Sequence, residues 1–206
     1  MIKAIFFDFG GVIYTHPKEV TAEILSKIYH YSLTQTIKTY GALKTDYFSG
    51  KITTEKLIDS LSRTFKSKKT IDEVKRLWLK YYSVLARPDK TVLTIIKVLR
   101  KQKYKTYLIS NTNKMSDLHN RKVGIYDYFD GLFLSFELGL CKPNLEFYKL
   151  VLSRLNIKAE ECVFIDDDEK NLGPARSLGI NTILFDILKD KPSTLKDKLQ
   201  EIGVKI

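Results

Sequence analysis

The stretch AIFFDFGG, residues 4–11, decides the fold and lies at the start of the chain. Residues 4–7 are apolar and β-prone without polar alternation, which is typical of a strand buried on both faces in a parallel sheet. Asp8 ends this run and glycines follow, so a carboxylate stands where the backbone can turn sharply, at the edge where open α/β sheets bind ligands. Asp8 is therefore a candidate functional residue, although an Asp before glycines is also a common helix cap or turn residue.

The composition indicates a globular protein. The chain has 206 residues, 44% hydrophobic and 29% charged, enough to bury one core domain with a large insert. No stretch approaches the roughly twenty apolar residues of a membrane span, and the first apolar run is too short for a signal peptide. We therefore expect a cytoplasmic protein with no membrane partner. Cys141 and Cys162 fit a reducing compartment, and little motivates a disulfide between them.

The formal net charge of +11 raises the question of anionic partners. Lysines spread along the whole chain supply most of the positive charge, and we find neither an arginine-rich tract nor a nucleic-acid motif. A solvated lysine-rich surface is the simpler interpretation, so no nucleic-acid partner is expected. The positive charge of such a surface is enough to attract small anions such as phosphate esters, without a dedicated binding motif. The sequence leaves a monomer and a homodimer equally open.

The segment after the first turn has a helical pattern. Apolar residues recur at helical spacing over three ranges, about 17–32, 53–65 and 70–85. Thr70 and Glu73 form a capping box at the start of the third. No convincing strand is found there, so the sequence predicts a helical cap domain over residues 15–87 and a core domain made of residues 1–14 and 88–206. The 47–51 loop is either a substrate contact in this cap or a packed turn.

The rest of the chain alternates between helices and strands. Strands are predicted at 106–109, 132–136, 162–165 and 181–185, and helices at 90–101, from Pro143 to 155, at 171–178 and once more after Asp186. This alternation predicts an α/β protein with a doubly wound parallel sheet.

Polar residues follow three of these strands as Asp8 follows the first. Ser110 and Asn111 could hold a phosphate oxygen or simply form a turn, and Lys142 could be a fixed cation or a surface charge. The run Asp166 to Glu169 places four acids at the end of a buried strand, where their mutual repulsion favours a bound cation.

Together, Asp8, Ser110, Lys142 and the pair Asp166-Asp167 resemble the four motifs of the haloacid dehalogenase superfamily, over nearly the whole chain. The acidic pair resembles the subgroup with two acids in its last motif (subfamily IA, variant 3). That subgroup includes the phosphatase domain of soluble epoxide hydrolases and bacterial sugar-phosphate phosphatases. The resemblance implies a Rossmann-like core with a helical cap after the first strand.

The resemblance also implies a role for each motif residue. Asp8 would attack phosphorus to form an aspartyl-phosphate. Mg²⁺ would be bound by Asp8, the backbone carbonyl of Gly10 and Asp167, with Asp166 orienting this set from outside. Ser110, the backbone amide of Asn111 and Lys142 would bind the transferring phosphoryl group and neutralise its charge. The expected activity is Mg²⁺-dependent hydrolysis of a small phosphomonoester such as a sugar phosphate.

One position departs from the family pattern. Family phosphatases usually carry a second Asp two residues after the nucleophile, as general acid and base, and here that residue is Gly10. Such a loss typically slows proton transfer by about two to four powers of ten, so the enzyme is expected to be slow or to use a substitute. His16 is one candidate substitute, although a surface histidine is the simpler interpretation. The alternatives are a 2-haloacid dehalogenase-type hydrolase and a non-catalytic binding or regulatory protein.

Overall fold

The computed structural model describes residues 1–16 and 18–206 and contains one five-stranded parallel sheet. The strands are β1 Ala4–Phe7, β2 Lys105–Ser110, β3 Gly131–Leu134, β4 Cys162–Asp166 and β5 Asn181–Leu184. Their order across the sheet is β3-β2-β1-β4-β5, so β1 is central and pairs with both β2 and β4. The predicted doubly wound α/β fold is confirmed, and the order reverses between β1 and β4, where such sheets bind ligands.

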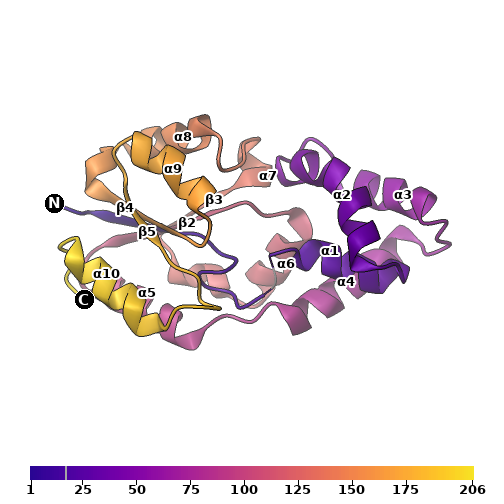
Figure 1. Ribbon diagram of the computed structural model, residues 1–206, viewed down its shortest axis with the longest axis horizontal. Helices are drawn as coiled ribbons and strands as arrows, with labels where there is room; N and C mark the ends of the chain where they lie inside the picture. The colour runs from indigo at the N-terminus through magenta and orange to yellow at the C-terminus, as the bar shows by residue number, and fades with distance from the viewer. Residues whose placement is uncertain (17) are drawn as a thin grey trace.

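Helices cover both faces of the sheet (Figure 1). Helices α8 (Leu145–Leu155) and α9 (Glu169–Ser177) pack on one face, and α5 (Lys90–Lys101) and α10 (Pro192–Glu201) on the other. The side chains of β1 alternate between the two faces, with Phe6 in the core under α8 and α9 and Phe7 in the core on the side of α5 and α10. All four β1 residues are at most 1% exposed, which explains the unbroken apolar run in the sequence.

Between β1 and α5 the described residues form helices and no strand. These helices are α1 Val20–Tyr29, α2 Leu33–Phe48, α3 Thr54–Thr64 and α4 Ile71–Leu85, and they lie beyond one end of the sheet (Figure 1). The capping box of Thr70 and Glu73 is present at the start of α4. The first predicted helix was placed from about Pro17, which lies outside the described residues, and α1 begins at Val20. No separate helix was predicted over 33–48, because the apolar spacing of α2 is weak.

The chain leaves and re-enters the core at adjacent points. The amide of Thr15 donates to the carbonyl of Arg87 at 3.0 Å, and Tyr14 forms an isolated bridge with Pro88. The helical segment is therefore joined to the core by two chain segments that lie side by side. The division into a core of 1–14 and 88–206 and a cap of 15–87 agrees with this and stays a prediction. At the far side, the Ser135 hydroxyl donates to the Phe48 carbonyl at 2.6 Å, which ties α2 to the core.

The remaining elements are short or lie around the sheet edges. They are α6 Lys114–Lys122, α7 Ser135–Leu138 and two 3₁₀ turns, Ile125–Tyr128 and Ala159–Glu161. The third strand was predicted to run to residue 136, which is wrong: it ends at Leu134, and α7 begins at Ser135. Helix α8 starts at Leu145 with Asn144 as its cap, so Pro143 precedes it instead of filling its first turn. Helix α9 begins at Glu169, two residues before the predicted start, because Asp168 caps it.

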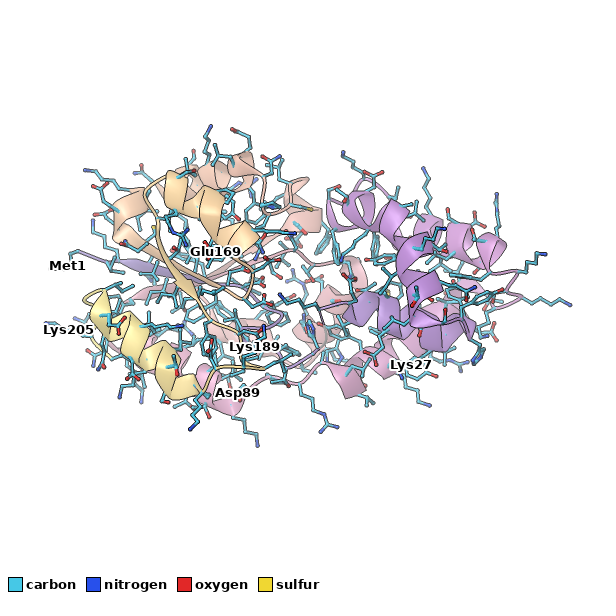
Figure 2. The ribbon with its side chains drawn as sticks, viewed as in Figure 1. Met1, Lys27, Asp89, Glu169, Lys189 and Lys205 are labelled. Carbon is cyan, nitrogen blue, oxygen red and sulfur yellow. The ribbon has the colours of Figure 1, made fainter. Side chains whose placement is uncertain are left out.

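The surface carries the lysines that the composition implied. Lys27 and Lys205, for example, lie toward opposite ends of the molecule (Figure 2). Cys141 and Cys162 are both free thiols, as expected. No helix among the described residues is long and apolar enough to cross a membrane.

Candidate active site

Asp8 lies directly after β1, at the point where the strand order reverses. Its amide donates to the carbonyl of Ile165 in β4 at 2.9 Å, which continues the strand pairing by one residue. The residue is 8% exposed, so its carboxylate is nearly removed from bulk water. The register of β1 against β4 also brings Asp166 to this edge, because Phe7 pairs with Ile165 and the next residues are Asp8 and Asp166.

Three carboxylates converge at this edge. Asp8, Asp166 and Asp167 each offer one oxygen, and these oxygens all lie within 4.8 Å of one another. An all-oxygen set of this kind suits a hard divalent cation such as Mg²⁺. The sequence placed these residues on two different strands, and the structure brings them together.

Lys142 reaches the same cluster from the loop before α8. Its Nζ donates to Asp8 Oδ1 and to Asp166 Oδ2, both at 2.7 Å, and its side chain is 1% exposed. The Asn111 side chain holds this loop through two hydrogen bonds of 2.8 Å with the backbone of residue 142. Lys142 is thus a fixed internal cation, and the alternative of a surface charge is wrong.

Asp166 has its oxygens occupied by donors. Besides Lys142, the amide of Asp168 donates to Oδ1 at 2.8 Å, and the side-chain amide of Asn171 donates to both oxygens at 3.0 and 3.1 Å. The residue is completely buried. A carboxylate held by this many donors fits the predicted role outside the metal's ligands.

The electrostatics show that the cluster lacks positive charge. Burial raises the pKa of Asp8 to about 7, against the opposing effect of Lys142. Burial and the charge of Asp166 also raise the pKa of Asp167. Burial alone would lower the pKa of Lys142, but the Asp166 and Asp8 carboxylates outweigh it and raise the pKa, so the ammonium stays charged. Lys142 and the more exposed Lys18, which reaches Asp167, are two lysines against three carboxylates, and a further cation fits the site.

The turn after Asp8 is shaped around Asp167. Gly11 has φ +77°, and a Cβ placed on it would lie 2.5 Å from Cγ of Asp167. The backbone can approach the carboxylate this closely only because residue 11 has no side chain. Gly11 therefore sets the position of Asp167, a function that the sequence did not reveal.

A profile of the family described as haloacid dehalogenase-like hydrolase matches residues 2–179. The chain is a haloacid dehalogenase-like hydrolase. The family assignment made from the four motifs is confirmed, while the finer subgroup stays a prediction.

Relatives of this hydrolase include named phosphatases. D-ribitol-5-phosphate phosphatase of Bacteroides thetaiotaomicron is 28% identical over 99% of this chain and 98% of its own length. Bifunctional epoxide hydrolase 2 of Rattus norvegicus is 33% identical over 53% of this chain, a segment that spans 20% of that protein. Among solved structures, a haloacid dehalogenase family enzyme of Bacteroides thetaiotaomicron in complex with magnesium and inorganic phosphate has a TM-score of 0.72 and 28% identity, covering 89% of this chain and 93% of its own.

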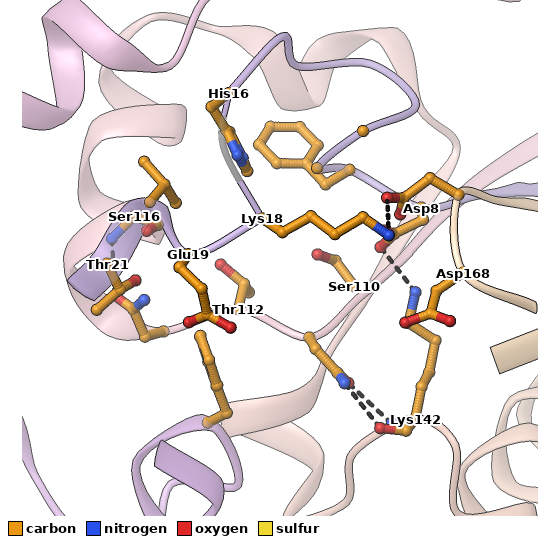
Figure 3. Close-up of a pocket in the computed structure, with 18 of the residues that line it drawn as sticks. Asp8, His16, Lys18, Glu19, Thr21, Ser110, Thr112, Ser116, Lys142 and Asp168 are labelled. Carbon is orange, nitrogen blue, oxygen red and sulfur yellow. Dashed lines mark hydrogen bonds and ion pairs between the residues drawn. The ribbon is translucent and has the colours of Figure 1, made fainter. Parts of the chain in front are cut away.

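The pocket of the hydrolase also contains residues that sequence reasoning missed (Figure 3). Lys18 reaches Asp167 with an ammonium-to-carboxylate distance of 3.2 Å, and Lys44 pairs with Glu19 at 2.9 and 3.0 Å. Further lining residues that were not singled out from the sequence include Thr21, Tyr82, Ser116, Asp186 and Leu188. Most come from the cap or from turns whose sequence resembles ordinary polar surface, so no motif marked them.

The remaining predicted residues divide between site and scaffold. Ser110 is 3% exposed and lines the pocket with Asn111 and Gly10. In the 47–51 loop, for which a substrate contact and a packed turn were both open, only Phe48 lines the pocket with Asp8. Tyr47 is buried, and its hydroxyl contacts Thr54 at 3.1 Å, so the packed-turn alternative describes Tyr47.

Proposed function

We propose that this hydrolase cleaves small phosphomonoesters, sugar phosphates above all, with Mg²⁺ as cofactor and Asp8 as nucleophile. One observation carries the proposal: the Asp8 carboxylate lies in a pocket with a buried ammonium 2.7 Å away and two further carboxylates beside it. A dianionic phosphoryl group needs such positive charge, and a carboxylate cluster needs a metal to coexist with that group.

The protein groups have complementary roles in this mechanism. Asp8 attacks phosphorus, the bond to the ester oxygen breaks, and the phosphoryl group is left on the Asp8 carboxylate. Lys142 lies against the attacking carboxylate and neutralises charge there, while the Ser110 hydroxyl and the Asn111 amide bind phosphoryl oxygens. Water then displaces Asp8 and releases inorganic phosphate. Mg²⁺ held by Asp8, Asp167 and the Gly10 carbonyl would supply charge stabilisation for the phosphoryl oxygens.

The cap side of the pocket supports a polyhydroxylated leaving group. Its wall includes the Lys44–Glu19 ion pair, Thr21 and Ser116, which offer both hydrogen-bond donors and acceptors. Sugar and polyol hydroxyls match such a wall better than an alkyl chain does. The full-length similarity to a D-ribitol-5-phosphate phosphatase points to the same class.

The decisive assay offers sugar phosphates, polyol phosphates, para-nitrophenyl phosphate and 2-haloacids to the purified protein with Mg²⁺ or with a chelator. We expect phosphate release in Mg²⁺ and its loss in the chelator. Metal-independent halide release would instead identify a dehalogenase. No turnover of any compound would indicate a non-catalytic binding protein.

Gly11→Ala tests the fit of the acidic cluster around the metal. The new methyl group would meet Asp167 and displace it, so we expect a 10- to 100-fold weaker response to Mg²⁺, roughly the cost of disturbing groups that orient metal ligands. The measurement is the Mg²⁺ concentration that gives half-maximal phosphate release.

Gly203→Ala is the matched control for this change. Gly203 also has a left-handed backbone, φ +83°, but a Cβ there meets nothing within 4 Å. Both variants carry the backbone strain, about 1–2 kcal/mol, and only Gly11→Ala crowds Asp167. Equal Mg²⁺ responses in the two variants would show that Gly11 does not position the metal ligand.

A further inference from the structure

The imidazole of His16 occupies the space that a side chain at residue 10 would fill. A Cβ placed on Gly10 would lie 2.6 Å from Cε1 and 3.0 Å from Nε2 of His16. Gly10 lacks the positive φ that would by itself favour glycine, unlike Gly11. A side chain at residue 10 and the His16 imidazole would therefore compete for the same space.

His16 also belongs to the pocket that contains Asp8. Both residues line it, and His16 and Lys142 approach it from opposite sides in the view of Figure 3. His16 is half-buried and lies on the cap side of the Asp8 turn. A leaving group that departs from phosphorus away from Asp8 must move toward the cap, which brings its oxygen to the side of the pocket where His16 lies.

The other acids and bases of the pocket, among the described residues, already have different roles. Glu19 is held by Lys44 through both oxygens, and Asp186 pairs with Lys189 at 2.8 Å. Burial raises the pKa of Tyr82 to about 12, which suits neither an acid nor a base near neutral pH. His16 is the histidine that lines the pocket among the described residues, and an imidazole can both donate and accept a proton.

We propose that His16 is the proton donor and acceptor of the reaction, an inference that rests on the proposed phosphomonoesterase function. As the phosphorus–oxygen ester bond breaks, its electron pair goes to the leaving oxygen, which takes a proton from the His16 imidazolium. The neutral imidazole then takes a proton from the attacking water. The water oxygen bonds to phosphorus, the bond between phosphorus and Asp8 breaks, and the carboxylate and the imidazolium are restored.

The test compares two esters that differ in their need for a proton. A sugar or alkyl phosphate has a poor leaving group, while para-nitrophenolate leaves without protonation. For His16→Ala we expect kcat/KM for the alkyl phosphate to fall 100- to 10,000-fold. Rapid mixing with para-nitrophenyl phosphate should still give a burst of about one nitrophenolate per active site, followed by slow turnover, because only the second step still needs a base.

Gly10→Ala probes the same space from the other side. Its methyl group displaces the imidazole, so we expect the same selective loss as in His16→Ala, and no additional loss when the two changes are combined. Adding Gly10→Asp to His16→Ala puts a carboxylate into the vacated space and should recover alkyl phosphate hydrolysis. His30→Asn, at an exposed histidine after α1, is the control and should leave both esters unaffected.

The outcomes separate this inference from the function on which it rests. If wild type releases no phosphate from either ester, the proposed function is wrong. If wild type is active and His16→Ala loses both esters equally, including the nitrophenolate burst, His16 only shapes the pocket and the inference is overturned. Full alkyl phosphate activity in Gly10→Ala or His16→Ala overturns it as well.

Discussion

Asp8→Asn should abolish phosphate release while making the metal-free protein more stable in alkaline solution. Loss of the nucleophile is expected to lower kcat on the order of a thousand-fold or more. The stability change has a separate cause, since burial raises the pKa of Asp8 to about 7 in the folded chain. A carboxyl group whose pKa is higher in the folded chain than in the unfolded chain contributes its full stabilisation only below the unfolded pKa of about 4. This contribution is lost as the pH rises through the folded pKa of about 7.

The measurement is the free energy of unfolding of both proteins with a chelator present, at pH 5 and pH 8. Wild type should lose stability between these values relative to Asp8→Asn, which has no carboxyl group to ionise at that position. Mg²⁺ should raise the melting temperature of wild type and have little effect on the variant. A variant that keeps phosphate release, or that responds to Mg²⁺ as wild type does, would contradict the role given to Asp8.

Lys142→Met should be the most destabilising single change at the site. The ammonium is buried between Asp8 and Asp166, at 2.7 Å from each, and its removal leaves two buried carboxylates without their cation. Breaking a buried ion pair on one side typically costs about 3–5 kcal/mol. The raised pKa of Lys142 keeps it charged over this range, but Asp8, with a pKa of about 7, ionises between pH 6 and pH 8, so the loss should be larger at pH 8. Denaturant unfolding gives the difference directly.

Two companion variants make the Lys142 result specific. Lys149→Met removes a half-exposed lysine on α8 that pairs with Glu146 at 2.8 Å, and it should cost less than about 1 kcal/mol. Adding Asp166→Asn to Lys142→Met removes one of the unpaired charges and should recover part of the loss. Additive effects of the two substitutions would mean that Lys142 and Asp166 do not act as a pair.

The sequence predicted the sheet and the motif residues because strong local signals marked them. The run before Asp8 could be only a strand buried on both faces, and the chain order of four polar strand ends determined which groups meet. In contrast, the end of the third strand was missed, because no Gly, Pro, Asn or Asp follows Leu134 to mark a turn and Phe136 is again apolar. The chain turns there into α7 to place the Ser135 hydroxyl on Phe48, a contact with a residue far away in the chain.

The cap-side wall of the pocket could not be predicted for a related reason. Lys18 and Lys44 look like any other lysine in a lysine-rich chain, and their roles depend on how the cap helices lie over the sheet. The contact between residue 10 and His16 could be predicted only in part. The sequence showed that residue 10 has no proton to give, but the filling of that space by an imidazole six residues later depends on the turn geometry.

The helical segment leaves the core at Thr15 and returns at Arg87, and because these residues are hydrogen-bonded to each other, the segment can be exchanged as one unit. Because its two ends nearly touch, a different insert could join the same two points without altering any connection within the sheet. On the proposed division into core and cap, the strand ends would carry the nucleophile and the metal ligands, and the exchanged segment would carry the cap-side wall of the pocket together with His16. A chimera that carries a foreign insert between these points would keep Asp8, Lys142 and the acidic cluster of this core, but it would lose His16 and take its cap-side groups from the donor.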